Sequence, residues 1–192
     1  MRSVATVLLA VSASALFVHA PESRAGGVAM ARPPRLPVVT AVVFPGEGWG
    51  PGPYRLKASI DVFDTWKLPR HRLATVRAGT VVTLSSGVNL VSEPDRVKAT
   101  APVPEFGLLG DETFYRYMER GEGWADIWAN GRWYANADAA FIQNADRSGC
   151  GTNCRALEVT HGKKTWWIEV QLSDGRTGWT DKTDEFPASG TR

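Results

Sequence analysis

The chain of 192 residues carries 22 basic and 20 acidic side chains, and this near balance excludes the basic excess that a nucleic-acid-binding protein normally shows. Its length suffices for one ordinary domain or two small ones, each with a modest core. Eight tryptophans make the aromatic content unusually high, and a small domain cannot bury all of them.

The N-terminus has the features of an export signal. A basic start, Met1-Arg2, is followed by the apolar run Val4–Val18, which is too short to cross a bilayer. Small residues precede two candidate cleavage positions, after Ala20 and after Ala25, and the later is preferred because the earlier would leave a proline directly behind the cut. We therefore predict a signal peptide over residues 1–25 and an exported chain, periplasmic or secreted, with no membrane span after its removal.

The next segment is rich in proline and glycine. Six prolines lie between Arg32 and Pro53, and glycines cluster over residues 46–52. This composition is typical of an extended arm or linker. We predict such an arm over residues 26–53, with one short strand at Val38–Phe44.

From Tyr54 onward the chain shows short apolar and polar alternations separated by proline, glycine and asparagine. Frequent short strands without helical periodicity predict an all-β fold built from antiparallel hairpins, since parallel strands would need crossover helices. Outside the hairpins described next, the expected strands are Arg55–Phe63, Leu73–Arg77, Thr80–Leu84, Val88–Val91, Arg96–Ala99, Thr113–Glu119 and Ala156–Thr160.

Two segments of the chain are similar to each other. Gly123–Tyr134 reads GWADIWANGRWY, and Thr165–Trp179 reads TWWIEVQLSDGRTGW. Each has a strand, a turn at Asn130-Gly131 or Asp174-Gly175 followed by arginine, and a second strand with aromatics. Asn-Gly and Asp-Gly tolerate the positive φ angles that tight hairpins need, so both segments are predicted to be hairpins.

Side-chain alternation assigns two faces to each hairpin. In the first, Ala125, Ile127 and Ala129 share one face and are expected to point inward. The opposite face carries Trp124, Asp126 and Trp128. In the second, one face carries Trp166, Ile168, Val170 and Leu172, and the other carries Trp167, Glu169 and Gln171.

These segments resemble bacterial SH3-like domains of exported cell-envelope proteins. The closing signature of that family, a W-x-x-V strand, an Asp/Asn-Gly turn and Gly-Trp, is matched by Thr165–Trp179 and less fully by Gly123–Tyr134, which lacks the glycine. The opening signature, which ends in Ala-Gly-Thr, resembles Ile60–Leu84. The resemblance covers roughly half of the mature chain, and Ser85–Arg120 intervenes as an insertion.

The resemblance implies one or two small SH3-like barrels. We expect a first unit with an insertion at 54–141, a second, partial unit at 142–186, and a disordered tail at 187–192. It also implies peptidoglycan or its stem peptides as the ligand class.

The two cysteines, Cys150 and Cys154, are expected to form a local disulfide in a glycine-rich loop. A metal site would need two further ligands, and a thioredoxin-like motif has two intervening residues rather than three. No metal and no cofactor are therefore expected. Closing so short a loop should contribute only about 2 kcal/mol.

The predicted binding site is an aromatic platform on the first hairpin. Trp124 and Trp128 would flank the Asp126 carboxylate, with Trp133 and Tyr134 beside them, a surface suited to stacking on sugar rings or peptide side chains. The alternative is that another part of the chain covers this face, since large apolar patches are rarely exposed.

Catalytic residues are scarce in the sequence. His71 lies between arginines and His161 precedes a glycine, and neither belongs to a nucleophile motif. We therefore expect a non-catalytic module that binds a cell-envelope component. The alternatives are a periplasmic or secreted protein-binding factor, such as an inhibitor or assembly accessory, and a small hydrolase.

Overall fold

The computed structural model of the chain describes residues 27–30, 32–41, 43–46, 48–121 and 123–187. The predicted signal peptide and residues 188–192 of the predicted tail lie outside the described residues. The described chain is all-β, as predicted: its strands form two sheets, and its helices are two single turns, η1 (Pro104–Phe106) and η2 (Thr183–Glu185). Among these residues, no helix has the length and hydropathy needed to span a membrane.

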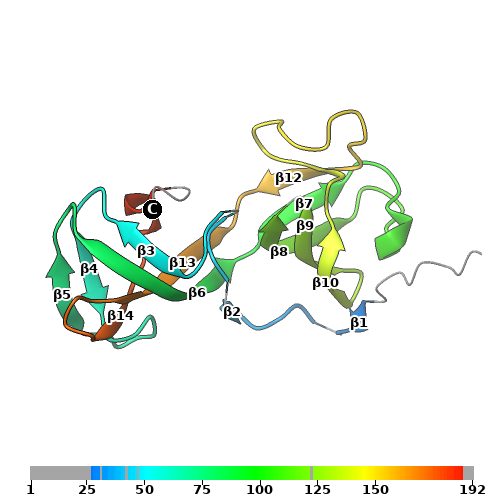
Figure 1. The fold of residues 1–192 in the computed structure, drawn as a ribbon. Coiled ribbons are helices and arrows are strands. Elements are labelled where there is room, and N and C mark those ends of the chain that lie inside the picture. Colours follow the sequence, from blue (N-terminus) through cyan, green and yellow to red (C-terminus); the bar gives the residue numbers. More distant parts are fainter. Residues whose placement is uncertain (1–26, 31, 42, 47, 122, 188–192) are drawn as a thin grey trace, which may run out of the picture.

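One sheet, here called sheet A, has the strand order β1-β10-β9-β8-β7-β12-β11 and lies to the right in Figure 1. Its strands are β1 (Val28–Ala29), β7 (Asp95–Ala99), β8 (Thr113–Gly121), β9 (Trp124–Ala129), β10 (Arg132–Asp138), β11 (Ile142–Gln143) and β12 (Ala156–Thr160). All neighbours are antiparallel except β11 and β12, which are parallel. These two short strands are joined by a long loop rather than by a crossover helix.

The other sheet, sheet B, has the order β2-β6-β13-β14-β4-β5, and β3 also pairs with β6. Its strands are β2 (Val38–Ala41), β3 (Gly52–Arg55), β4 (Ile60–Phe63), β5 (Arg72–Val76), β6 (Val81–Glu93), β13 (Lys163–Gln171) and β14 (Thr177–Thr180). Each sheet has its own buried core. In Figure 1 the long strands β6 and β13 run from the left lobe toward the right one.

The two sheets are nested in the sequence rather than consecutive. The chain builds most of sheet B up to β6, makes sheet A from β7 to β12, and returns to sheet B with β13 and β14. The expected units 54–141 and 142–186 therefore do not coincide with the sheets. β12 pairs with β7, a contact between distant segments that no local pattern reveals.

Strand β6 is continuous where the sequence predicts two strands separated by a turn. Its central Gly87 makes no turn, and it pairs with Ile168. A Cβ at Gly87 would lie 1.9 Å from the carbonyl oxygen of Val43, whose own N–H donates to Gly87 O at 3.1 Å. The glycine therefore permits a close backbone approach, which is the other common reason for glycine inside a strand.

Both predicted hairpins form, with different turns. Asn130 and Gly131 have φ angles of 45° and 71°, the geometry of a two-residue turn with both central residues left-handed. In the second hairpin only Gly175 has a positive φ, and Leu172 N–H donates to Arg176 O. This is the geometry of a three-residue loop, and it accommodates one residue more than the first turn.

The predicted Pro/Gly-rich arm contacts both sheets. Its β1 pairs with β10 in sheet A, and its β2 pairs with β6 in sheet B. Met30 N–H donates to Gly131 O at 2.8 Å, and the Arg132 guanidinium donates to Gly27 O. A Cβ at Gly27 would lie 2.5 Å from the Tyr134 ring, so the arm lies tightly against this core side chain. The arm therefore pairs with one strand of each sheet and connects them.

Candidate functional site

Three aromatic side chains stand next to one another across sheet A. Tyr115 on β8 pairs in register with Trp128 on β9, and Trp128 pairs with Trp133 on β10. Their sequence neighbours Phe114, Ile127 and Tyr134 belong to the core, so the three aromatics occupy the outer face. Tyr115, Trp128 and Trp133, here called the aromatic row, are each partly exposed.

The aromatic row is flanked by one charged and one aliphatic residue. Arg96 on β7 pairs with Tyr115, and Val28 on β1 pairs with Trp133. Both flanking residues are exposed. The Tyr115 and Trp128 ring centroids are 6.0 Å apart. Strands lie about 4.8 Å apart, so the row extends about 10 Å across the sheet, which is the length of a disaccharide.

Next to the row, Tyr117 is buried and its ring meets Trp133 edge-on at 5.1 Å between centroids. Burial, with a smaller effect from neighbouring Tyr115, raises the pKa of Tyr117 to about 12. Trp128 Nε1 is buried and has no hydrogen-bond partner among the described residues. An unsatisfied buried donor at a surface site is a group that a ligand or water can satisfy.

The structure brings together only two of the five predicted platform residues. Trp128 and Trp133 are paired neighbours. Trp124 lies at the far end of β9 and lines a separate groove. Tyr134 is in the core, where its ring meets Phe106 at 4.8 Å, because the alternation of β10 turns it inward.

Asp126 does face outward by strand parity, but its carboxylate is buried and engaged. It accepts two hydrogen bonds from the Arg120 guanidinium, at 2.6 and 3.1 Å, and one from the N–H of Asn136 at 2.9 Å. This carboxylate therefore holds β9 and β10 in place. Its predicted role as a ligand acceptor would require these three bonds to be given up.

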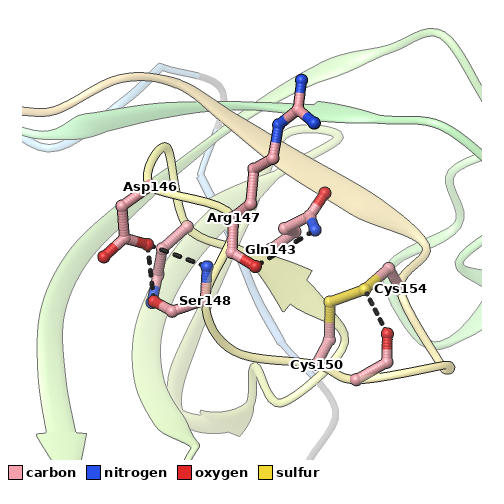
Figure 2. Close-up of a disulfide and its surroundings, with 8 residues drawn as sticks. Gln143, Asp146, Arg147, Ser148, Cys150 and Cys154 are labelled. Carbon is pink, nitrogen blue, oxygen red and sulfur yellow. Dashed lines mark hydrogen bonds between the residues drawn. A yellow bond between two sulfur atoms is a disulfide. The ribbon is translucent and has the colours of Figure 1, made fainter.

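The groove that Trp124 lines has a volume of about 1040 Å³. It lies between the end of β9 and the loop of residues 144–155, here called the disulfide loop. Cys150 and Cys154 are bonded to each other in this loop, as predicted, and both line the groove. Figure 2 shows the loop held by local polar contacts: Asp146 Oδ1 accepts hydrogen bonds from the N–H and hydroxyl of Ser148, and the Gln143 amide donates to Arg147 O.

A cluster of charged residues joins the two sheets next to this groove. Arg116 on β8 is buried and donates to Asp95 Oδ2 at 2.7 Å and to Glu158 Oε2 at 2.6 Å. Lys164, near the start of β13 in sheet B, also donates to Asp95 Oδ2 at 2.7 Å. His161 Nδ1 lies 2.8 Å from Glu158 Oε1. These five residues are here called the charged joint.

The buried carboxylates of the charged joint have cationic partners. Burial alone would raise the pKa of Asp95, but the charge and hydrogen bond of Lys164, the Gly162 N–H and Arg116 together hold it below its usual value. Asp95, Glu158 and His161 place ligand atoms within 4.8 Å of one another, as a metal site would. The two cations already bound to these carboxylates oppose a metal ion there.

His71 and His161, the two histidines among the described residues, make no nucleophile pair there. His161 contacts carboxylates, and the backbone N–H of His71 donates to Asp64 Oδ1 at 2.9 Å. Both cysteines are in the disulfide. No imidazole among the described residues is hydrogen-bonded to a serine hydroxyl, the arrangement that would have favoured the hydrolase alternative.

Comparison with protein-family models, with curated protein sequences and with solved structures found no match for this chain. The resemblance to SH3-like domains thus stays a prediction from the residues quoted above.

Sequence analysis missed Tyr115, Arg96 and the charged joint. Tyr115 and Arg96 lie in strands that were expected, but the pairing of Tyr115 with Trp128 and of Arg96 with Tyr115 depends on register between separate strands. The charged joint unites β7, β8, β12 and β13. Arg116 lies among apolar residues of a predicted strand, where an unpaired charge is very costly. This position could have indicated that Arg116 has buried charged partners.

Proposed function

We propose that this protein is an exported, non-catalytic binding module that recognises peptidoglycan through the aromatic row. The observation that carries the proposal is the in-register alignment of three partly exposed aromatic rings on the outer face of sheet A. Flat aromatic surfaces of this kind stack on the apolar faces of sugar rings. Arg96, at the end of the row, offers donors for a carboxylate or hydroxyl.

Two further observations support the proposal. A disulfide in the loop beside β11 is typical of proteins that fold in an oxidising compartment, in keeping with the predicted export signal. The buried Trp128 N–H has no partner among the described residues, so a water or ligand oxygen that reached it would satisfy a donor next to the tilted Tyr115 and Trp128 rings.

Purified sacculi test the proposal. We expect the protein to sediment with them, and the double variant Trp128→Leu, Trp133→Leu to bind about tenfold more weakly, because two stacking surfaces are lost. Leucine keeps apolar cover over Tyr117. Trp66→Leu, which removes a partly exposed indole from the sheet B lobe, is the matched control and should bind normally.

Unchanged recovery of the folded double variant would reject the aromatic row as the binding surface. Failure of the unmodified protein to bind sacculi, together with capture of an envelope protein, would favour the protein-binding alternative instead.

A further inference from the structure

We propose that the groove beside Trp124 binds the side-chain ammonium group of a lysine-like residue in a peptide. The groove is separate from the aromatic row, and this inference does not depend on the function proposed above. It rests on an exposed indole, an adjacent carboxylate and the charge balance of the groove.

The indole and the carboxylate come from directly paired residues. Trp124 on β9 and Asp138 on β10 are partners in register, and both line the groove. Residues paired in this way project from the same face with their Cβ atoms about 5 Å apart. Trp124 is 45% exposed, far more than a tryptophan that serves only as core. A cation placed over this indole would have the Asp138 carboxylate beside it.

The arginines of the groove are already neutralised. Arg116 is held by Asp95 and Glu158 in the charged joint. Arg155 donates two hydrogen bonds to Glu105 and stacks over the Phe141 ring at 4.9 Å. Hydrogen bonding to Glu105 and, less strongly, the charge of Asp138 raise the pKa of Arg155, so both guanidinium groups of the groove already have carboxylate partners.

The carboxylates exceed the cations around the groove. The lining residues Arg116 and Arg155 balance the lining residues Glu119 and Asp138. Behind them, three more carboxylates, those of Asp95, Glu158 and Glu105, face one ammonium group, that of Lys164. Among these described side chains, five carboxylates accompany three cations, a formal excess of two negative charges when histidine is counted as uncharged, which favours a cationic ligand.

The lining of the groove suits an alkyl-ammonium chain. Ala139 and Ala140 line it next to Asp138. These small apolar side chains can contact the methylene groups of a lysine while its charged end reaches the indole and the carboxylate. The groove exceeds the size of one side chain, and the Asn153 amide in its lining can hydrogen-bond a peptide backbone.

The test is a titration of the full mature chain, followed by the indole N–H signals in nitrogen–proton NMR spectra. The probes are Nα-acetyl-lysine methylamide and its uncharged counterpart Nα-acetyl-norleucine methylamide. The Trp124 signal is the one lost in Trp124→Phe. We expect the lysine probe to shift this signal in a saturable manner, with the norleucine probe binding at least about tenfold more weakly.

Two matched variants test the carboxylate. Asp138→Asn keeps the Oδ1 acceptor of the Ala140 N–H and should weaken binding of the lysine probe about tenfold. Asp146→Asn removes the same charge from the disulfide loop, keeps the acceptor of the Ser148 N–H, and should bind normally. The variant Trp128→Leu, Trp133→Leu should also bind the probe normally, which separates this site from the aromatic row.

Equal binding of the two probes would overturn the proposal. So would an Asp138→Asn variant that binds the lysine probe as well as the unmodified protein, or an equal loss in Asp146→Asn.

Discussion

The hairpins β9–β10 and β13–β14 have similar sequences, and aligning the two segments places Trp124 opposite Trp167. These two tryptophans nevertheless lie in different environments. Trp124 is 45% exposed at the edge of a groove, whereas Trp167 is 2% exposed. Arg70, from the connection between β4 and β5, stacks on Trp167 at 4.6 Å, and Phe63 meets it edge-on at 6.2 Å. The difference comes from the segment that covers each hairpin and not from the hairpin itself.

The acidic residues at the next outward position differ in the same way. Asp126 is buried and bonded to the Arg120 guanidinium, while Glu169 accepts a hydrogen bond from the Ser85 hydroxyl at 2.6 Å and is less buried. The inward residues, in contrast, are equivalent: Ile127 and Val170 are both fully buried. A shared pattern therefore specifies the core side of a hairpin more strictly than its outer side.

The largest expected effect is at the charged joint, which connects the sheets that contain the two hairpins. Arg116→Met would remove the cation that bonds both buried carboxylates, Asp95 and Glu158, and would leave Asp95 with Lys164 alone. We expect the free energy of unfolding to fall by about 3–5 kcal/mol in urea denaturation. Arg96→Met, an exposed position on the neighbouring strand, should change it by less than about 0.5 kcal/mol. Similar small losses in both variants would contradict this account of the joint.

The contrast between the two tryptophans predicts a difference in stability. Trp167→Ala should lower the free energy of unfolding by about 3 kcal/mol, because it opens a cavity beneath Arg70 and Phe63. Trp124→Ala should cost less than about 1 kcal/mol, because much of its indole is already in solvent. Thermal denaturation of both variants measures the difference, and equal losses would show that exposure does not distinguish the hairpins.

An alkaline titration tests the packing next to the first hairpin. The pKa of Tyr117 is raised to about 12 in the folded protein, from an ordinary value of 10.0. Between these values the unfolded chain loses the phenol proton and the folded chain keeps it. Stability should therefore be unaffected by this group below pH 10 and fall above it, by about 1.4 kcal/mol per pH unit at most.

Tyr117→Phe supplies the comparison for that titration. Its stability should decline less steeply between pH 10 and 12 than that of the unmodified protein, measured by urea denaturation at each pH. Parallel curves for the two proteins would mean that Tyr117 ionises normally.

The disulfide next to the groove of the first hairpin should make a modest, local contribution. The double variant Cys150→Ser, Cys154→Ser should lose about 2 kcal/mol, because the bond closes a short loop. Reduction of the unmodified protein should produce the same loss, measured as a shift in its denaturation midpoint. Unfolding of the whole chain on reduction would show that the loop supports more of sheet A than its local contacts imply.

Local chemistry was sufficient to predict several features correctly. The Asn130-Gly131 turn, the inward set Ala125, Ile127 and Ala129, and the Cys150–Cys154 pair were all predicted and are present. Each depends on residues close in sequence: a turn on the φ angles its residues tolerate, a face on alternation, and the disulfide on spacing.

The position of Gly87 illustrates the opposite case. It reads as a turn in the sequence, and it is a strand residue because Val43 approaches its backbone from the distant arm. The nesting of the two sheets likewise depends on β12 pairing with β7. Such pairings bring together segments that are far apart in the chain, so no window of the sequence contains both partners.

The amino-acid sequence thus determined the all-β class, the two hairpins and their inward faces, since these follow from backbone preferences and alternation within short segments. Only the tertiary structure decided that Tyr115 completes a row with Trp128 and Trp133, that Tyr134 and Asp126 are withdrawn from the surface, and that Trp124 borders a groove. The physical reason is that exposure and neighbourhood are set by long-range pairing and packing, which add contacts that each segment alone does not specify.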